Sequence, residues 1–457
     1  MGPISRVVGL YQALLRQLLE HFFPDALLEI QGDRSVINWN GSLDETYYRL
    51  IDDQDGLGLG IEWLGTLLTF RPESPVPLLP LERKLVEVVV RALDLRFRGL
   101  FDQDLDDRLE RFQFLTEDLI IADFLETSGR YRVPAALEAL RVAALSTYEN
   151  RRVSMGVLLL GTPEDPANPH RRNTEGAPRF NSRLTSIKGF HRLCDGVQTA
   201  FLVDLQGELL RIADIEYWAE RVQGVEPPEH PCPRQYDSHA KATRAGGHVC
   251  LVLTPAQEIK VFAGGTMVFS LSDARWRLLD IPSKFAAWNE AVGQTSFPEL
   301  ARCVFQAALN LSEARTGALL VVVRDPERAI RELIVPIDRI TEEVAEDDPQ
   351  DPENLSPRLA KRALHHAVRG ASLCDLEPLV LESIASLDGA VVVDRAGGLL
   401  TFGAILRIAP ETLELVRSVQ GARTLAALAA SRYGPVLKVS QDGYITMFLK
   451  GRRVWEL

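Results

Sequence analysis

The fold is decided by the stretch Val203-Asp204-Leu205-Gln206-Gly207-Glu208-Leu209-Leu210, which occurs again 190 residues later as Val393-Asp394-Arg395-Ala396-Gly397-Gly398-Leu399-Leu400. The two stretches are identical at five of eight positions. Each consists of an apolar segment, a turn that contains glycine and a second apolar segment, which is the pattern of a β-hairpin. A second shared pattern follows each hairpin, from Leu253 to Gly265 and from Val439 to Gly451. We therefore predict an internal repeat of one domain.

The segments that precede the two hairpins also repeat. Ala135–Tyr148 has the apolar spacing of a helix, and Met155–Leu160 that of a short buried strand. The same order returns in Phe297–Leu311 and Thr316–Val323. We therefore expect an α/β protein with two mixed-sheet domains, each flanked by helices.

The N-terminal third has a different pattern. Apolar residues recur at helical spacing in Leu10–Phe23 and in Leu81–Leu95, so we predict a mostly helical region there. The chain as a whole is expected to divide into residues 1–135, 136–286 and 287–457.

The composition is that of an ordinary globular protein, with 457 residues of which 46% are apolar and 25% charged. A net charge of −12 argues against binding nucleic acid through the overall field of the protein. The five cysteines form no C-x-x-C pair, which excludes a disulfide framework as the expected design and favours the cytoplasm. No apolar window is long enough to span a membrane.

Two short motifs in the second copy have the residue types of a phosphate site. Asp388-Gly389-Ala390 stands directly before the hairpin, where a glycine permits close approach and a carboxylate can bind a divalent cation. Gly421-Ala422-Arg423-Thr424 predicts a turn into a helix, where N–H groups and an arginine suit phosphate. Each motif alone is common, because Asp-Gly is a frequent turn and an arginine at a helix start is usually solvated.

The ordered set of motifs resembles the diadenylate cyclase (DAC) domain family, whose members join two ATP molecules into cyclic di-AMP. It comprises the strand Arg315–Val322, the Asp-Gly-Ala motif, a hairpin, Gly-x-Arg and a second hairpin. The resemblance implies a nucleotide site made of Asp388, Gly389, Ala390, Gly421, Arg423, Thr424 and Ser440. It further implies that Asp388 binds Mg²⁺ or Mn²⁺ and helps to activate the ribose 3′-hydroxyl if the protein is an active enzyme.

The chain departs from the family pattern in both copies. Where the family has Arg-His-Arg, the second copy reads Arg423-Thr424-Leu425, and Ser440-Gln441-Asp442 replaces Ser-Glu-Glu. A gapless alignment on the hairpin places Gln198-Thr199-Ala200 opposite Asp388-Gly389-Ala390, whereas Asp195 and Gly196 are the counterparts if three residues are inserted. In the other motif the first-copy counterpart is His239, which lacks both flanking arginines. Because DAC domains work face to face, we hypothesise an intrachain pseudo-dimer in which the two copies share a composite cleft.

Three functions follow as hypotheses. The first is a sensor that binds ATP or a cyclic dinucleotide with eroded catalytic motifs. The second is an active diadenylate cyclase that uses Asp388 and Arg423 with Mg²⁺ or Mn²⁺, and for which His239 of the first copy is a further candidate. The third is an interaction scaffold without a ligand. The missing His-Arg pair favours the sensor, because phosphoryl transfer depends on the charge stabilisation that such groups supply. A site that has lost them can still bind the adenine of a nucleotide.

Overall fold

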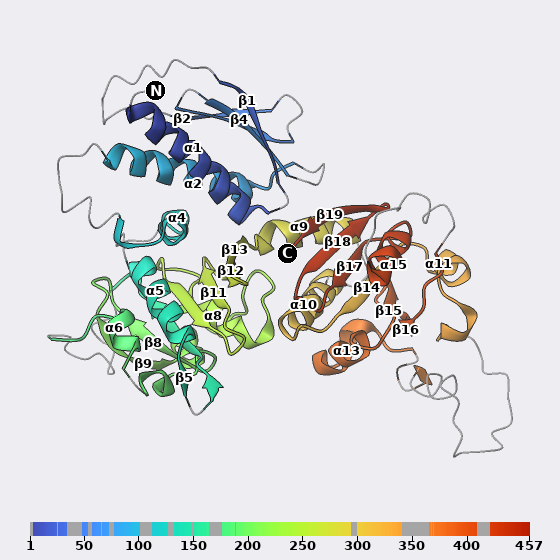
Figure 1. Ribbon diagram of the computed structural model, residues 1–457. Helices are drawn as coiled ribbons and strands as arrows, with labels where there is room; N and C mark the ends of the chain where they lie inside the picture. The colour runs from blue at the N-terminus through green and yellow to red at the C-terminus, as the bar shows by residue number, and fades with distance from the viewer. Residues whose placement is uncertain are drawn as a thin grey trace. The chain divides into compact units, whose positions relative to one another are not determined.

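The structure is a computed structural model. It describes residues 3–24, 26–33, 48–53, 57–64, 66–72, 77–100, 112–126, 132–148, 150–163, 176–187, 189–293, 299–340, 365–366, 368, 370–408 and 421–457. The chain forms two compact units (Figure 1). Unit 1 comprises Met1–His230 and Gln235–Asp280, and unit 2 comprises Pro231–Arg234 and Ile281–Leu457. The mixed α/β character predicted from the sequence is confirmed, because both units combine helices with sheets.

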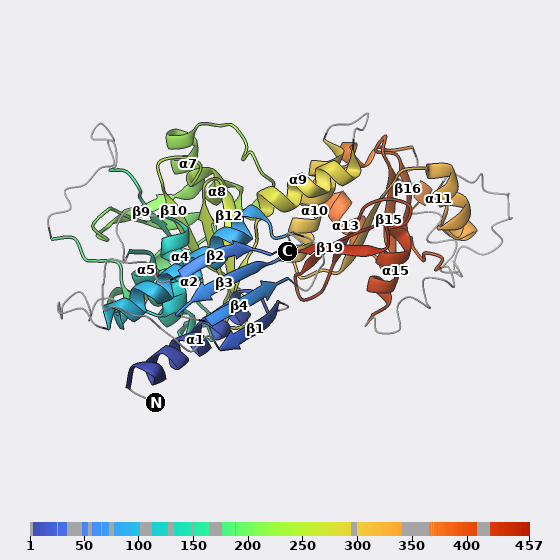
Figure 2. The ribbon, with the colours of Figure 1, turned by 90° about the horizontal axis from the view of Figure 1, so that it is seen from above.

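The N-terminal part of unit 1 contains a sheet as well as helices, so a mostly helical region is not confirmed. Helix α1 (Pro3–Phe22) is followed by four strands and then by α2 (Pro80–Gly99) and α4 (Thr116–Phe124). The strands are β1 (Leu27–Asp33), β2 (Tyr48–Asp52), β3 (Leu59–Trp63) and β4 (Thr66–Arg71). They form an antiparallel sheet in the order β1-β4-β3-β2 (Figure 2). Strand β3 buries alternate side chains, as a sheet with one covered face requires.

The rest of unit 1 is built on a seven-stranded sheet in the order β13-β12-β11-β10-β7-β8-β9. The strands are β7 (Met155–Leu159), β8 (Thr199–Val203), β9 (Leu209–Asp214), β10 (Val249–Leu253), β11 (Ile259–Ala263), β12 (Thr266–Ser272) and β13 (Arg275–Leu278). The associated helices are α5 (Arg132–Ala144), α6 (Ser182–Thr185), α7 (Ile215–Gln223) and α8 (Asp237–Ala242). One hydrophobic core extends from Val8 in α1 to Trp276 in β13, through both parts of the unit. The division at residue 136 stays a prediction.

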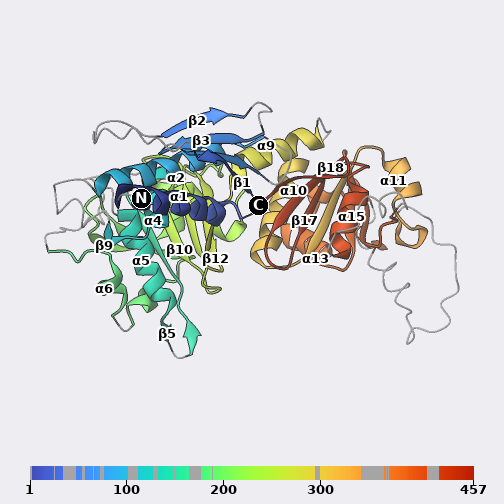
Figure 3. The same cartoon turned by 45° about the horizontal axis from the view of Figure 1, so that its top comes forward.

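Unit 2 is built on a six-stranded sheet in the order β16-β15-β14-β17-β18-β19. The strands are β14 (Ala318–Val323), β15 (Ala390–Asp394), β16 (Leu399–Ala404), β17 (Val436–Val439), β18 (Ile445–Leu449) and β19 (Arg452–Glu456). The helices are α9 (Ile281–Val292), α10 (Leu300–Glu313), α11 (Pro326–Glu332), α13 (Pro378–Ala385) and α15 (Ala422–Ala430). Helix α10 lies on one face of the sheet and α15 on the other (Figure 3).

Six strands of the two sheets share one order and one set of directions, which is what the predicted repeat requires. The central pairs β7–β8 and β14–β15 are parallel, and the remaining neighbours are antiparallel. The first hairpin turn is also bonded alike in both copies. Asp204 Oδ1 accepts N–H bonds from Gln206 and Glu208, and Asp394 Oδ1 accepts them from Ala396 and Gly398. This turn chemistry explains why the Val-Asp-x-x-Gly pattern occurs twice.

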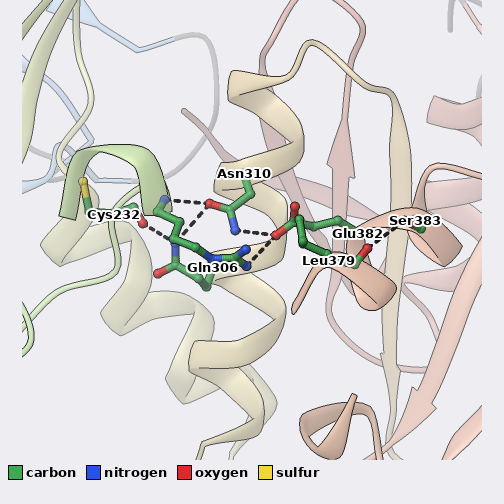
Figure 4. Close-up of polar contacts among 7 residues, drawn as sticks. Cys232, Gln306, Asn310, Leu379, Glu382 and Ser383 are labelled. Atoms are coloured by element: carbon green, nitrogen blue, oxygen red, sulfur yellow. Dashed lines mark hydrogen bonds and ion pairs between the residues drawn. The ribbon is translucent and has the colours of Figure 1, made fainter. Parts of the chain in front are cut away.

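Unit 2 is discontinuous in sequence, because Pro231–Arg234 belongs to it. The Gln306 side chain of α10 donates to the Cys232 carbonyl (Figure 4). The Arg234 N–H donates to Asn310 Oδ1 at 2.9 Å. The Arg234 guanidinium and the Asn310 amide both donate to Glu382 Oε1 in α13, at 2.8 and 2.6 Å. These bonds hold the four-residue segment on α10 and α13.

Of the helices in the described part of the chain, none combines the length and the apolar character that crossing a bilayer requires.

Candidate functional site

Three predicted site residues of the second copy lie close together at the end of the unit 2 sheet where β14 and β15 begin. Asp388 stands just before β15, and Arg423 and Thr424 lie in the first turn of α15. Arg423 Nη2 is 3.3 Å from Asp388 Oδ1. The side chain of Asp388 is fully exposed and that of Arg423 is 36% exposed, so water screens this ion pair and it is weak. A phosphate could therefore replace the carboxylate beside Arg423 at little cost.

The position of the Arg423 guanidinium depends on Gly317, the residue before β14. A Cβ atom at Gly317 would lie 3.0 Å from Cζ of Arg423 and closer still to Nη1. The guanidinium therefore rests directly over the glycine backbone. Gly317 belongs to the Arg-x-Gly-Ala-Leu-Leu-Val-Val strand motif, but its contact with Arg423 joins residues far apart in the sequence.

Lys438 on β17 is a site residue that the sequence reasoning missed. Its Nζ donates to Thr424 Oγ1 at 3.1 Å, so this cation contacts the residue that follows Arg423 in α15. Burial lowers the pKa of Lys438 from its usual value, and Glu456 opposes this shift. Lys438 pairs across the sheet with Thr446, whose hydroxyl donates to Glu456 at 3.0 Å. The only signal in the sequence is a lysine within the apolar strand Val436–Val439.

The other predicted residues of this copy have roles within the fold. Gly389 has a φ of +121°, and a Cβ there would lie 2.5 Å from the Ala404 nitrogen. Ala390 is buried and pairs with Ala404. Gly421 is the N-cap of α15, with a φ of +101°. The Ser440 hydroxyl accepts the Tyr444 N–H in the second hairpin turn, at 3.1 Å. Their part in ligand binding stays a prediction.

In the first copy, Gly196 and His239 are buried within unit 1, whereas Asp195 is exposed at its surface. Asp195 Oδ1 accepts the N–H groups of Val197, Gln198 and Thr199 at 2.9–3.0 Å. Burial alone would raise the pKa of Asp195, but these bonds outweigh it and lower the pKa. Gly196 has a φ of +79°, and a Cβ there would lie 2.6 Å from the carbonyl carbon of Met155. The Asp-Gly pair is thus used to close a loop.

His239 is fully buried beside this loop. Its ring packs against Tyr236 and Phe262, which also contact each other, and Nε2 lies 2.9 Å from the Gly196 carbonyl oxygen. Burial lowers the pKa of His239 to about 4, so the ring is neutral at pH 7 and Nε2 carries the proton that Gly196 accepts. A role for His239 in a composite cleft stays a prediction, and it would require this packed core to open.

Within the described residues, no group of three or more His, Cys, Asp and Glu side chains is placed to hold a metal ion. Asp388 offers one exposed carboxylate. This fits a Mg²⁺ or Mn²⁺ ion that arrives with a nucleotide, because Mg²⁺ sites often combine one or two carboxylates with substrate phosphates.

No protein-family model and no curated protein matches the chain. Solved structures do show likenesses. A hypothetical membrane spanning protein from Bacillus cereus is 23% identical, over 38% of this chain and 75% of that one, with a TM-score of 0.26. A double mutant of DacA from Staphylococcus aureus is 20% identical, over 34% of this chain and 85% of that one, with a TM-score of 0.19. Likenesses at these TM-scores carry no argument about function.

Proposed function

We propose that the second copy is a DAC-like nucleotide-binding module and that the protein senses ATP or a cyclic dinucleotide. The observation that carries the proposal is the Arg423 guanidinium, held over Gly317 and paired only weakly with Asp388. An arginine in this position presents a fork of donors that suits phosphate. Lys438 and Thr424 extend the same surface with a cation and a hydroxyl.

An active cyclase is the second candidate, and Lys438 is the observation that favours it. Lys438 supplies a cation next to Thr424, which stands at a position where the DAC pattern has its histidine. The sensor is nevertheless preferred, because a leaving pyrophosphate needs several cationic groups and the described residues of this site supply two, Arg423 and Lys438. Bound Mg²⁺ or Mn²⁺ would supply further positive charge to the phosphates, with Asp388 as its protein ligand.

The Arg423→Ala variant is expected to bind ATP or cyclic di-AMP roughly 10- to 150-fold more weakly than the wild type. This range corresponds to about 1.5–3 kcal/mol for a hydrogen bond to a charged group. Isothermal titration calorimetry measures the change, with Arg452→Ala as the control because Arg452 is exposed on β19. Equal affinities of Arg423→Ala and the wild type would remove Arg423 from the site. If neither ligand binds the wild type, the scaffold hypothesis takes precedence.

The same protein incubated with ATP and Mn²⁺ or Mg²⁺ separates the two nucleotide hypotheses. Chromatography is expected to return the ATP unchanged. Formation of cyclic di-AMP that is lost in Asp388→Asn would instead establish the cyclase.

The Gly317→Ala variant is expected to weaken nucleotide binding roughly tenfold without lowering the thermal stability. The added methyl group meets the flexible end of Arg423, so it displaces the guanidinium without moving the backbone. Gly434→Ala is the contrasting variant, because a Cβ there would lie 3.0 Å from the carbonyl carbon of Val322 and closer to its oxygen. It should lower the melting temperature. An equal loss of stability in both variants would show that Gly317 serves the fold rather than Arg423.

A further inference from the structure

Unit 1 contains a cavity of about 640 Å³ that the proposed nucleotide site does not use. Leu159 and Val203, the last residues of the parallel strands β7 and β8, line it. The first two turns of α5 and the hairpin turn at Gln206 and Gly207 form further walls. The Asp195-Gly196 pair precedes β8, so this cavity lies at the other end of that strand. The carboxyl ends of parallel strands are a frequent place for ligands in α/β sheets.

The charges around the cavity favour an anion. Arg132, Arg179 and Arg183 line it, against a single carboxylate, Glu138. Arg132 is buried, and its Nη1 donates to the carbonyl oxygens of Leu160 and Asp204 at 2.6 and 2.8 Å, so it has a structural task. Arg179 and Arg183 are exposed and have no ion-pair partner within the described part of the chain. Because both arginines are exposed, a ligand in the cavity can reach their guanidinium groups.

The remaining walls combine apolar and polar side chains. Phe114, Leu159, Val203 and Leu205 are among the apolar ones, and Gln113, Asn181, Ser182 and Gln206 are the polar ones. A cavity of a few hundred Å³ with apolar surface and polar groups that fix the orientation of a ligand is typical of sites for small organic molecules. A purely inorganic anion would leave the apolar part of the walls uncovered.

We propose that this cavity is a binding site for a small organic anion. Its carboxylate or phosphate pairs with Arg179 and Arg183, and its apolar body packs against Phe114, Val203 and Leu205. Arginine binds both kinds of anionic group through two parallel hydrogen bonds. None of these residues belongs to the proposed nucleotide site in unit 2, so the two proposals can be tested independently.

A pair of matched fluorescent probes tests the proposal on the full chain. 8-Anilinonaphthalene-1-sulfonate carries an anionic group, and N-phenyl-1-naphthylamine has the same aromatic body without it. The double variant Arg179→Glu/Arg183→Glu is expected to bind the sulfonate at least tenfold more weakly and the neutral amine within twofold of the wild type. Arg221→Glu, an exposed charge reversal on α7, is the control and should change neither affinity.

Binding in the cavity is distinguished from binding elsewhere on the protein by a third variant and by competition. Leu205→Trp should weaken both probes because the larger side chain fills the cavity. Displacement of the sulfonate by benzoate or by phenyl phosphate identifies the preferred anionic group, and the titration should be unchanged in Arg423→Ala. The proposal is overturned if the wild type shows no saturable binding, if neither competitor displaces the sulfonate, or if the double variant loses both probes equally or neither.

Discussion

Replacing Gly389 with alanine is expected to lower the free energy of unfolding of unit 2 by roughly 3 kcal/mol or more. Two costs act together. The φ of +121° is one that a side chain strains, and the new Cβ would lie 2.5 Å from the Ala404 nitrogen and closer still to the Gly403 carbonyl carbon. Those atoms belong to the backbone of β16, so they cannot rotate away as the end of a side chain could. Thermal unfolding followed by circular dichroism measures the loss.

The matched control is Gly421→Ala. Gly421 also has a positive φ, +101°, but the nearest atom to an added Cβ is Thr424 Oγ1 at 3.9 Å. The free energy of unfolding of Gly421→Ala should therefore fall only by the cost of backbone strain, about 1 kcal/mol. If the free energy of unfolding falls by the same amount in both variants, the close approach of Gly389 to β16 is not the reason that a glycine is required there. Because Gly389→Ala is expected to destabilise unit 2, a loss of nucleotide binding in that variant would not test the site.

Lowering the pH from 7 to 4 is expected to cost unit 1 about 3 kcal/mol through His239 alone. The pKa of His239 is about 4 in the folded protein, against an ordinary value of 6.5. Between these values the unfolded chain binds a proton that the folded chain excludes. The contribution of His239 is therefore fully present above pH 6.5 and is lost as the pH falls toward 4.

The variant His239→Leu isolates this effect, because leucine cannot take up a proton. Urea unfolding of the wild type and the variant at pH 7, 5.5 and 4 gives the difference in unfolding free energy at each pH. The unfolding free energy of the variant relative to that of the wild type should increase by about 3 kcal/mol between pH 7 and pH 4. A difference that does not change with pH would show that His239 is solvated or already protonated in the folded protein.

The sheets around the repeated hairpins could be predicted from the sequence because local chemistry specifies them. Asp204 and Asp394 each accept hydrogen bonds from backbone N–H groups a few residues away, so a short stretch of sequence is enough to specify the turn. The buried strands on either side are continuous apolar runs, such as Ala318–Val323. Helices α1 and α2 were equally clear, since their apolar spacing extends over 20 residues each.

The N-terminal sheet was harder to predict, because its strands have five to seven residues and carry mixed polar and apolar side chains. Their pairing depends on contacts along the whole region rather than on a repeated turn. The core provides one such contact, from Trp63 Nε1 in β3 to Asp94 Oδ1 in α2 at 3.1 Å. Local propensity carries little information about such pairings.

The candidate site was predictable only in part for the same reason. Asp388 and Arg423 belong to short motifs and could be named from their neighbours in the sequence. Lys438 could not, because its importance comes from the contact with Thr424 across the face of the sheet. The burial of His239 was also hidden, since the polar segment around it reads as solvated until Tyr236 and Phe262 enclose the ring.

The discontinuity of unit 2 also determines the order in which the protein can finish folding. Arg234 and its partner Glu382 are 148 residues apart, so a growing chain displays the segment Pro231–Arg234 long before α13 exists. Closing so large a loop costs conformational entropy that only the completed bonds to α10 and α13 recover. During synthesis, the segment Pro231–Arg234 therefore cannot reach its native position in unit 2 until α10 and α13, which follow it in the sequence, have formed.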